Sequence, residues 1–210
     1  MFYGLLHKIF LNIWPMLTVF IVVISLLRFF YLQNHRERFV LHKELSYLCG
    51  IIYIWMLFEI LTMTELNTKS GMNLTPFSEI FRYKIGSSLF KYNVLGNIII
   101  FIPFGYIIGK YVNPKKIWPV IITTTITSIV VEFVQLNIGR SFDIDDILLN
   151  VIGGILGYFL FVGLSAIKKR LPDVFKRDWF YNLLWIVAII LFIIYVFGYW
   201  KVVFKWMIIK

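Results

Sequence analysis

The chain has 210 residues, of which 60% are hydrophobic, 19% aromatic and 15% charged, and its mean hydropathy is +0.82. This composition excludes a soluble globular domain, because apolar segments of about 17–25 residues recur and each can cross a hydrocarbon core of roughly 30 Å. The net charge is +10 and there is one cysteine, Cys49. The basic residues lie between apolar segments, which favours lipid headgroups over nucleic acid as partners, and a lone cysteine excludes a disulfide framework within the chain.

Hydropathy predicts an all-α, polytopic membrane bundle of about six transmembrane helices. In chain order, the expected spans are residues 10–30, 45–63, 93–111, 117–136, 147–167 and 181–200. The first apolar run is longer than the core of a signal peptide, so we expect it to remain as a span. We expect three parts: an additional N-terminal transmembrane pair in residues 1–66, a membrane domain in residues 67–200 and a basic, aromatic tail in residues 201–210.

Three prolines mark specific places in these spans. Pro119 suits the first turn of the fourth span, where its missing N–H costs nothing, and Pro172 follows the fifth span as a stop. Pro103 lies inside the third span and is expected to kink it.

The distribution of Lys and Arg predicts the orientation. The connectors KYVNPKK and KKRLPDVFKR are strongly basic, whereas NIGRSFDIDD carries one cation. Because basic connectors stay in the cytoplasm, we expect a multi-pass protein of the cytoplasmic membrane with both termini and the aspartate-rich connector on the extracytoplasmic side.

The third span carries polar residues on one face. In NVLGNIIIFIPFG, Asn93 and Asn97 are one helical turn apart and Phe101 lies one turn further. Such amides either hydrogen-bond neighbouring helices or line a functional site. The sequence leaves both interpretations open.

The fourth span repeats this arrangement. In SIVVEFVQ, Ser128, Glu132 and Gln135 fall on a single helical face. An acidic residue near the centre of a membrane helix costs about 2.5–3.5 kcal/mol on insertion scales, so such residues are usually functional or paired inward. For Glu132 we favour function over structural pairing.

The stretch RSFDIDDILLN runs directly into the fifth span. Polar and then small residues follow at steps of three or four: Asp143, Asp146, Asn150, Gly153 or Gly154, and Gly157. An aspartate at a helix N-terminus caps free N–H groups, which explains one of the three, Asp143 or Asp145. Gly153-x-x-x-Gly157 resembles a small-residue motif for close helix contact.

Together these faces predict a polar cluster near the extracytoplasmic ends of three successive spans. Its expected members are Asn93, Asn97, Ser128, Glu132, Gln135, Asp143, Asp146 and Asn150, with Arg140 as counter-charge, and Glu59 is a further carboxylate inside a span. The carboxylates of Glu132, Asp143 and Asp146 could hold a divalent cation such as Mg²⁺ or Ca²⁺. They could equally accept hydrogen bonds from a lipid headgroup whose phosphate binds Arg140.

The motifs NLTPF, NVLGNIIIFIPFG, SIVVEFVQ and GRSFDIDDILLNVIGG, taken in this order, resemble the VanZ-like family of bacterial membrane proteins. The resemblance covers residues 70–160 best and extends over the expected domain 67–200. It implies resistance to teicoplanin and related lipid-tailed glycopeptides. The family's shared positions fall here on Asn73, Pro76, Asn93, Asn97, Phe101, Pro103, Gly105, Glu132, Gln135, Arg140, Asp143, Asp146, Asn150 and Gly153.

Three functions compete on this sequence. The first is a non-enzymatic protein whose extracytoplasmic polar cleft binds an envelope lipid, a lipid-linked cell-wall precursor or the lipoglycopeptide itself. The second is an intramembrane, metal-dependent enzyme acting on a polyprenyl-phosphate carrier, although the three histidines are remote from the cluster. The third is a transporter or flippase, for which no inverted repeat is visible. We favour binding, then catalysis, then transport.

Overall fold

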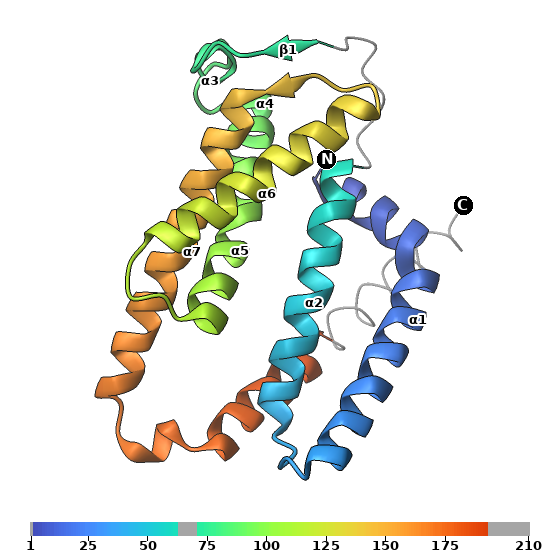
Figure 1. The fold of residues 1–210 in the computed structure, drawn as a ribbon, viewed down its shortest axis with the longest axis vertical. Coiled ribbons are helices and arrows are strands. Elements are labelled where there is room, and N and C mark those ends of the chain that lie inside the picture. The colour runs from blue at the N-terminus through green and yellow to red at the C-terminus, as the bar shows by residue number, and fades with distance from the viewer. Residues whose placement is uncertain (1, 63–70, 193–210) are drawn as a thin grey trace, which may run out of the picture. The chain divides into compact units, whose positions relative to one another are not determined.

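The computed structural model describes residues 2–62 and 71–192 (Figure 1). Its elements are α1 (Phe2–His35), α2 (Leu41–Thr62), β1 (Met72–Asn73), α3 (Ser78–Arg82), α4 (Ser88–Phe90), a π-helical turn (Lys91–Leu95), α5 (Gly96–Val112), α6 (Trp118–Asn137), β2 (Phe142–Asp143), α7 (Ile144–Arg170), a 3₁₀ turn (Asp173–Lys176) and a helix over Asp178–Phe192. The expected division at residue 66, the end of the sixth span and the tail 201–210 lie outside the described residues.

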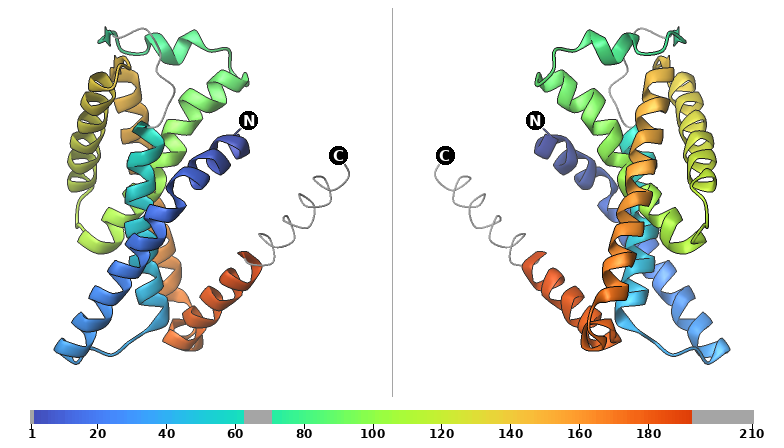
Figure 2. Two further views of the ribbon diagram at one scale, coloured as in Figure 1. Left: turned by 90° about the vertical axis from the view of Figure 1, so that its right-hand side faces the viewer. Right: turned by 90° about the vertical axis from the view of Figure 1, so that its left-hand side faces the viewer.

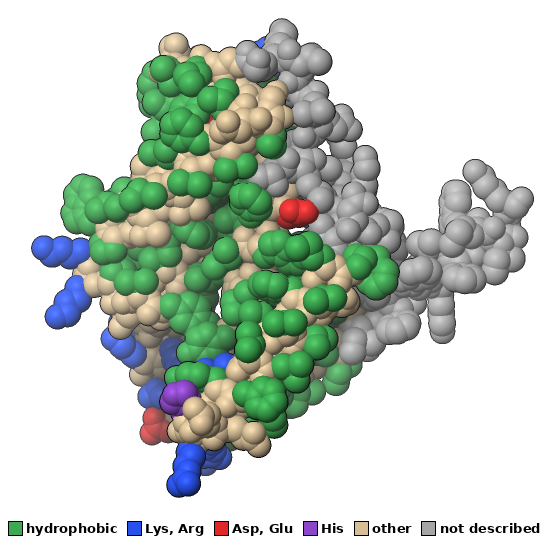
Figure 3. Space-filling model, turned by 45° about the vertical axis from the view of Figure 1, so that its right-hand side comes forward, with side chains coloured by type: hydrophobic (Ala, Val, Ile, Leu, Met, Phe, Trp, Pro, Cys, Tyr) green, Lys and Arg blue, Asp and Glu red, His purple; other side chains and the backbone are tan. Residues whose placement is uncertain are grey.

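The predicted all-α membrane bundle is confirmed. Among the described residues, four helices are long and apolar enough to cross a membrane: Trp14–His35, Ser88–Val112, Trp118–Asn137 and Ile144–Arg170. Asp178–Phe192 is a shorter apolar helix, so the predicted count of six is approximate. Figure 3 shows many hydrophobic side chains on the visible described surface, with few acidic side chains among them. An apolar exterior of this kind suits a hydrocarbon environment.

The third span begins earlier than the sequence predicted, at Ser88 rather than residue 93. The irregular backbone lies in the π-helical turn that precedes α5, where the N–H of Gly96 donates to the carbonyl of Lys91. The helix then continues through Pro103, and the kink expected there stays a prediction. Pro119 lies in the first turn of α6, as expected.

The described residues fall into two compact units, the first within Met1–Ile21 and Gly50–Ile167, and the second within Val22–Cys49 and Lys168–Lys210. In the second unit, Arg28 Nε donates to Glu44 Oε2 at 2.7 Å. The backbone N–H of His42 donates to Asn182 Oδ1 at 2.9 Å. These bonds connect residues that are far apart in the sequence.

The first unit is built around α5, α6 and α7, which pack side by side in the three views (Figures 1 and 2). Its hydrophobic core joins α5 and α6 to the second half of α2. The buried members are Leu57, Leu61, Phe101, Phe104, Ile108, Val120 and Val131. Tyr53 of α2 also donates its hydroxyl hydrogen to the carbonyl of Ile100, 2.5 Å away, one turn before the proline of α5.

Helices α5 and α7 approach each other backbone to backbone. A Cβ atom at any of three glycines would overlap a carbonyl oxygen of the facing helix. The three are Gly105 of α5 and Gly153 and Gly157 of α7. The close helix contact predicted from Gly153-x-x-x-Gly157 is therefore confirmed, and it is specific to glycine because no larger side chain fits.

A short connector crosses the end of this unit at which α6 ends and α7 begins (Figures 1 and 2). Its strand β1 pairs in parallel with β2, in the register Met72↔Phe142 and Asn73↔Asp143. The N–H of Phe142 extends the pairing by donating to the carbonyl of Gly71 at 3.0 Å. This two-residue ladder places the connector directly over the start of α7.

Candidate functional site

One hydrogen bond joins the polar faces predicted for the third and fifth spans. The amide Nδ2 of Asn97 on α5 donates to Oδ1 of Asp146 in the first turn of α7. Both side chains are half-buried. The spacing within each helix had predicted the two faces, and the structure brings them together.

Glu132 connects α6 to the same region. Its side chain is 1% exposed, and Oε2 accepts a hydrogen bond from the backbone N–H of Asp143 at 2.9 Å. This N–H belongs to the residue just before α7, so Glu132 fixes the start of that helix. The carboxylate is thus paired inward with the backbone, as buried acidic groups in membrane helices usually are.

Asp143 is the N-cap of α7. Its Oδ1 accepts from the backbone N–H of Asp145 at 2.9 Å, which is the usual bond from a capping side chain to the second helical residue. Asn73 Nδ2, opposite it in the β1–β2 ladder, lies 3.3 Å from each carboxylate oxygen. Burial raises the pKa of Asp143, and the bonds from Asp145 and Asn73 oppose that rise because they favour the ionised form.

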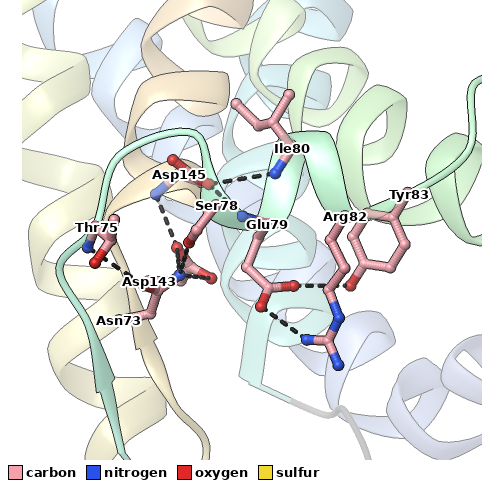
Figure 4. Close-up of polar contacts among 9 residues, drawn as sticks. All are labelled: Asn73, Thr75, Ser78, Glu79, Ile80, Arg82, Tyr83, Asp143 and Asp145. Atoms are coloured by element: carbon pink, nitrogen blue, oxygen red, sulfur yellow. Dashed lines mark hydrogen bonds and ion pairs between the residues drawn. The ribbon is translucent and has the colours of Figure 1, made fainter.

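Asp145 has a role that sequence reasoning missed. Its side chain is fully buried and accepts three backbone N–H groups of the connector: those of Phe77 at 2.5 Å, Glu79 at 2.8 Å and Ile80 at 3.3 Å. Figure 4 shows Asp145 beside Glu79 and Ile80. Of the two aspartates considered for capping, Asp143 caps its own helix and Asp145 caps α3. No local signal could have shown this, because its partners are more than sixty residues away in the sequence.

One of these three donors, Phe77, has an unfavourable backbone conformation. Its φ of 66° lies in the left-handed region, which a bulky non-glycine residue adopts at a cost of about 1–3 kcal/mol. The bonds from the N–H groups to the Asp145 carboxylate are charge-assisted and offset that cost. Pro76, a motif position, is exposed and precedes this residue.

A second polar contact joins α6 and α7 in the interior. Asn150 Nδ2 donates to Ser128 Oγ at 2.8 Å, and both side chains are buried. Thr124, one turn before Ser128, is fully buried and packs where a Cβ on Gly154 would fall. Thr124 was not predicted, although its spacing of four from Ser128 put it on the same face. Within the described residues, three buried acceptors have no hydrogen-bond partner: Thr124 Oγ1, Gln135 Oε1 and Asn150 Oδ1.

Gln135 and Arg140 meet at the end of α2. Gln135 Nε2 donates to the carbonyl of Leu61 at 2.8 Å, and Arg140 Nη1 donates to the same oxygen at 3.0 Å. A cation at a helix C-terminus complements the dipole there. The structure therefore places Arg140 as a cap of α2.

The remaining predicted residues have different surroundings. Phe101 is fully buried in the core, with its ring 5.6 Å from that of Phe104, which makes it a packing residue. Asn93 is half-buried. Burial is the largest cause that raises the pKa of Tyr83, and the charge of Glu79 adds to it.

The predicted divalent cation finds no ready ligand set. In the described parts of the chain, no group of three or more His, Cys, Asp or Glu side chains is placed to hold a metal ion. Glu132, Asp143 and Asp146 each accept hydrogen bonds from protein N–H groups. We therefore treat these carboxylates as hydrogen-bond acceptors, and the cation stays a prediction.

Comparison with known proteins adds independent information on the same region. A family model described as VanZ/LLP1 matches residues 44–169. The chain is also similar to Protein VanZ of Enterococcus faecium, with 30% identity over 136 residues, or 60% of this chain and 76% of that protein. No solved structure matches. The family match runs from the first turn of α2 to the last turn of α7 and contains every residue of the polar cluster.

Proposed function

Because the chain belongs to the VanZ/LLP1 family, we propose that it lowers bacterial susceptibility to teicoplanin and other lipid-tailed glycopeptides by binding a lipid-linked molecule at its polar cluster. The ligand is an envelope lipid, a lipid-linked cell-wall precursor or the antibiotic itself. The observation that carries this proposal is the half-buried Asn97–Asp146 pair, which joins α5 to the first turn of α7.

The cluster contains hydrogen-bond acceptors that a ligand could use. Asp146 contributes a half-buried carboxylate, and the amide oxygens of Gln135 and Asn150 are buried without partners among the described residues. Buried acceptors favour a ligand that brings N–H or O–H groups, because leaving such oxygens unpaired costs about 1–3 kcal/mol each. Hydroxyl, amine and amide groups on a lipid-linked headgroup meet this requirement.

Buried carboxylates hold the backbone around the Asn97–Asp146 pair in place. Glu132, Asp143 and Asp145 are buried and hold backbone N–H groups. Their bonds fix the first turn of α7, so the Asp146 carboxylate is presented in one position before a ligand arrives. A site held in its bound geometry loses less entropy on binding.

Resistance measurements with matched variants test the proposal. We expect Asp146→Ala and Asn97→Ala to lower the teicoplanin concentration that cells survive, at equal membrane abundance. Asp173→Asn is the control, because this aspartate is exposed and belongs to the other unit. Unchanged protection in both cluster variants would remove the polar cluster from the function.

The orientation of the cluster needs its own test. We propose that it faces the extracytoplasmic side, because the connector NIGRSFDIDD, which leads into α7, carries one cation. In a Cys49→Ser background, Ser141→Cys places a thiol at an exposed position beside Asp143. Labelling by a membrane-impermeant maleimide in intact cells is expected, and labelling only after permeabilisation would reverse the orientation.

A reconstitution experiment distinguishes binding from the enzyme and transporter alternatives. If purified protein in proteoliposomes hydrolysed a labelled polyprenyl phosphate, catalysis would replace binding as the mechanism. If it moved the intact lipid between leaflets, transport would replace it. Retention of a donor-rich lipid without turnover or movement is the result that the binding proposal expects.

A further inference from the structure

Residues 77–91, called here the surface segment, lie between β1 and the body of α5. Large apolar side chains recur every four residues along it and stand out from the protein. Phe77 is 53% exposed, Phe81 81%, Ile85 84% and Leu89 60%. We infer that the surface segment is a membrane-surface anchor, which inserts these side chains among the lipids and binds anionic headgroups through neighbouring basic residues.

The polar side of the segment is tied to the protein. Asp145 accepts the backbone N–H groups of Phe77, Glu79 and Ile80. Within the segment, Tyr83 donates its hydroxyl hydrogen to Glu79 Oε2 at 3.2 Å (Figure 4). These bonds fix which side of the segment faces inward. Phe77, and Phe81 in the next turn of α3, therefore cannot turn into the core without breaking them.

The position of the segment in the chain brings these side chains to the lipid boundary. The apolar span that contains α5 begins at Ser88, so Ile85 and Phe81 immediately precede the membrane-crossing part. At the other end, β1 is bonded to β2 directly before α7, the start of another span. Both ends of the segment are thus held close to where two spans enter the membrane, and apolar side chains at such a boundary are buried in the acyl region.

The charges of the segment favour lipid over a second copy of the chain. Arg82, Lys84 and Lys91 are exposed, and the one acidic residue among residues 77–91, Glu79, pairs with Arg82 at 2.8 Å. The remaining positive charge attracts the phosphate groups of anionic lipids. Two copies of the same basic segment would repel each other, so an anionic bilayer surface is the occupant that we propose.

Depth measurement by spin labelling tests this inference. In a Cys49→Ser background, single variants Phe81→Cys, Ile85→Cys and Ser141→Cys carry a nitroxide in nanodiscs of zwitterionic lipid, with or without anionic lipid. We expect labels at 81 and 85 to collide with oxygen several-fold more than the label at 141, and less with a nickel chelate. Anionic lipid should increase this difference.

Two results would overturn the anchor. Labels at 81 and 85 that meet the nickel chelate as readily as the label at 141 would place the segment in water. Labels shielded from both reagents would show that protein, such as a second copy, covers it. The double variant Lys84→Glu with Lys91→Glu should abolish the effect of anionic lipid on depth, and an unchanged effect would remove these lysines from the inference. Teicoplanin protection is not part of these readouts, so they are independent of the proposed function.

Discussion

Glu132 accepts the backbone N–H of Asp143 at 2.9 Å. This bond links the last turns of α6 to the residue that caps α7. The carboxylate thus satisfies a buried backbone donor where the chain turns from one helix to the next, and the folded state depends on that acceptor.

Replacing Glu132 tests this dependence. Glu132→Ala leaves the N–H of Asp143 buried without an acceptor, and we expect the free energy of unfolding to fall by about 1–3 kcal/mol. Glu132→Gln keeps an oxygen acceptor and should lose less. Denaturant unfolding of the purified variants in detergent measures both changes. Equal losses for Gln and Ala would show that the hydrogen bond is not the important feature.

The glycine contact between α5 and α7 gives a second prediction. In Gly157→Ala, the new Cβ would overlap the carbonyl oxygen of Ile102, so we expect the helices to separate and the yield of folded protein to collapse. Gly163→Ala is the matched control on the same helix, because nothing lies within 4 Å of a Cβ there. That variant should gain stability, up to about 1 kcal/mol from helix propensity. Size-exclusion profiles and melting temperatures distinguish the two, and equal tolerance would refute the contact.

Asp145 gives a third prediction because it holds the connector from a distance. Asp145→Ala removes the acceptor of the Phe77, Glu79 and Ile80 N–H groups. We expect hydrogen exchange of these three amides to accelerate by at least about tenfold, the equivalent of 1.4 kcal/mol, while amides in the middle of α6 keep their rates. Exchange that rises equally throughout the protein would indicate general destabilisation instead.

The fourth prediction concerns pH. Burial raises the pKa of Asp143 above its ordinary value of 3.8, so the folded protein binds this proton more tightly than the unfolded chain does. Its contribution to stability is complete below the unfolded pKa and is lost as pH rises through the folded pKa. Asp143→Asn keeps a capping oxygen without the charge.

Stability measured between about pH 4 and about pH 7 checks this prediction. The free energy of unfolding of the wild type should fall relative to that of Asp143→Asn as pH rises across this window. Parallel curves would show that the residue titrates normally. A wild type that gained stability relative to the variant would reverse the sign of the proposed effect.

Much of the fold could be predicted from the sequence, because its causes are local. Helix length follows from apolar runs, and the faces of α5, α6 and α7 follow from steps of three and four residues. The cap on α7 and the contact at Gly157 follow from residue type at a fixed position. These features need no knowledge of distant partners.

The rest depended on contacts across the chain. Asp145 bonds residues near 77, and Arg140 bonds the carbonyl of Leu61 at the end of another helix. Both residues lie near the start of α7. Their sequence neighbours alone fit a local helix cap or a counter-charge equally well. The π-helical turn at Lys91–Leu95 also has no local signature. Only the folded structure shows which distant backbone groups these side chains bind.

The three glycines between α5 and α7 also restrict how the cluster can open. At these three positions, carbonyl oxygens of one helix lie against the Cα atoms of the other. No side chain there can slide or change rotamer, so we expect α5 and α7 to move together. Asn97 lies on α5 and Asp146 on α7, so we expect the distance between them to stay constant when the two helices move together. If the proposed ligand binds at this pair, we expect it to enter through displacement of α6 or of the connector formed by β1 and α3, so that mutations that loosen α6 change the rate of ligand entry before they change affinity.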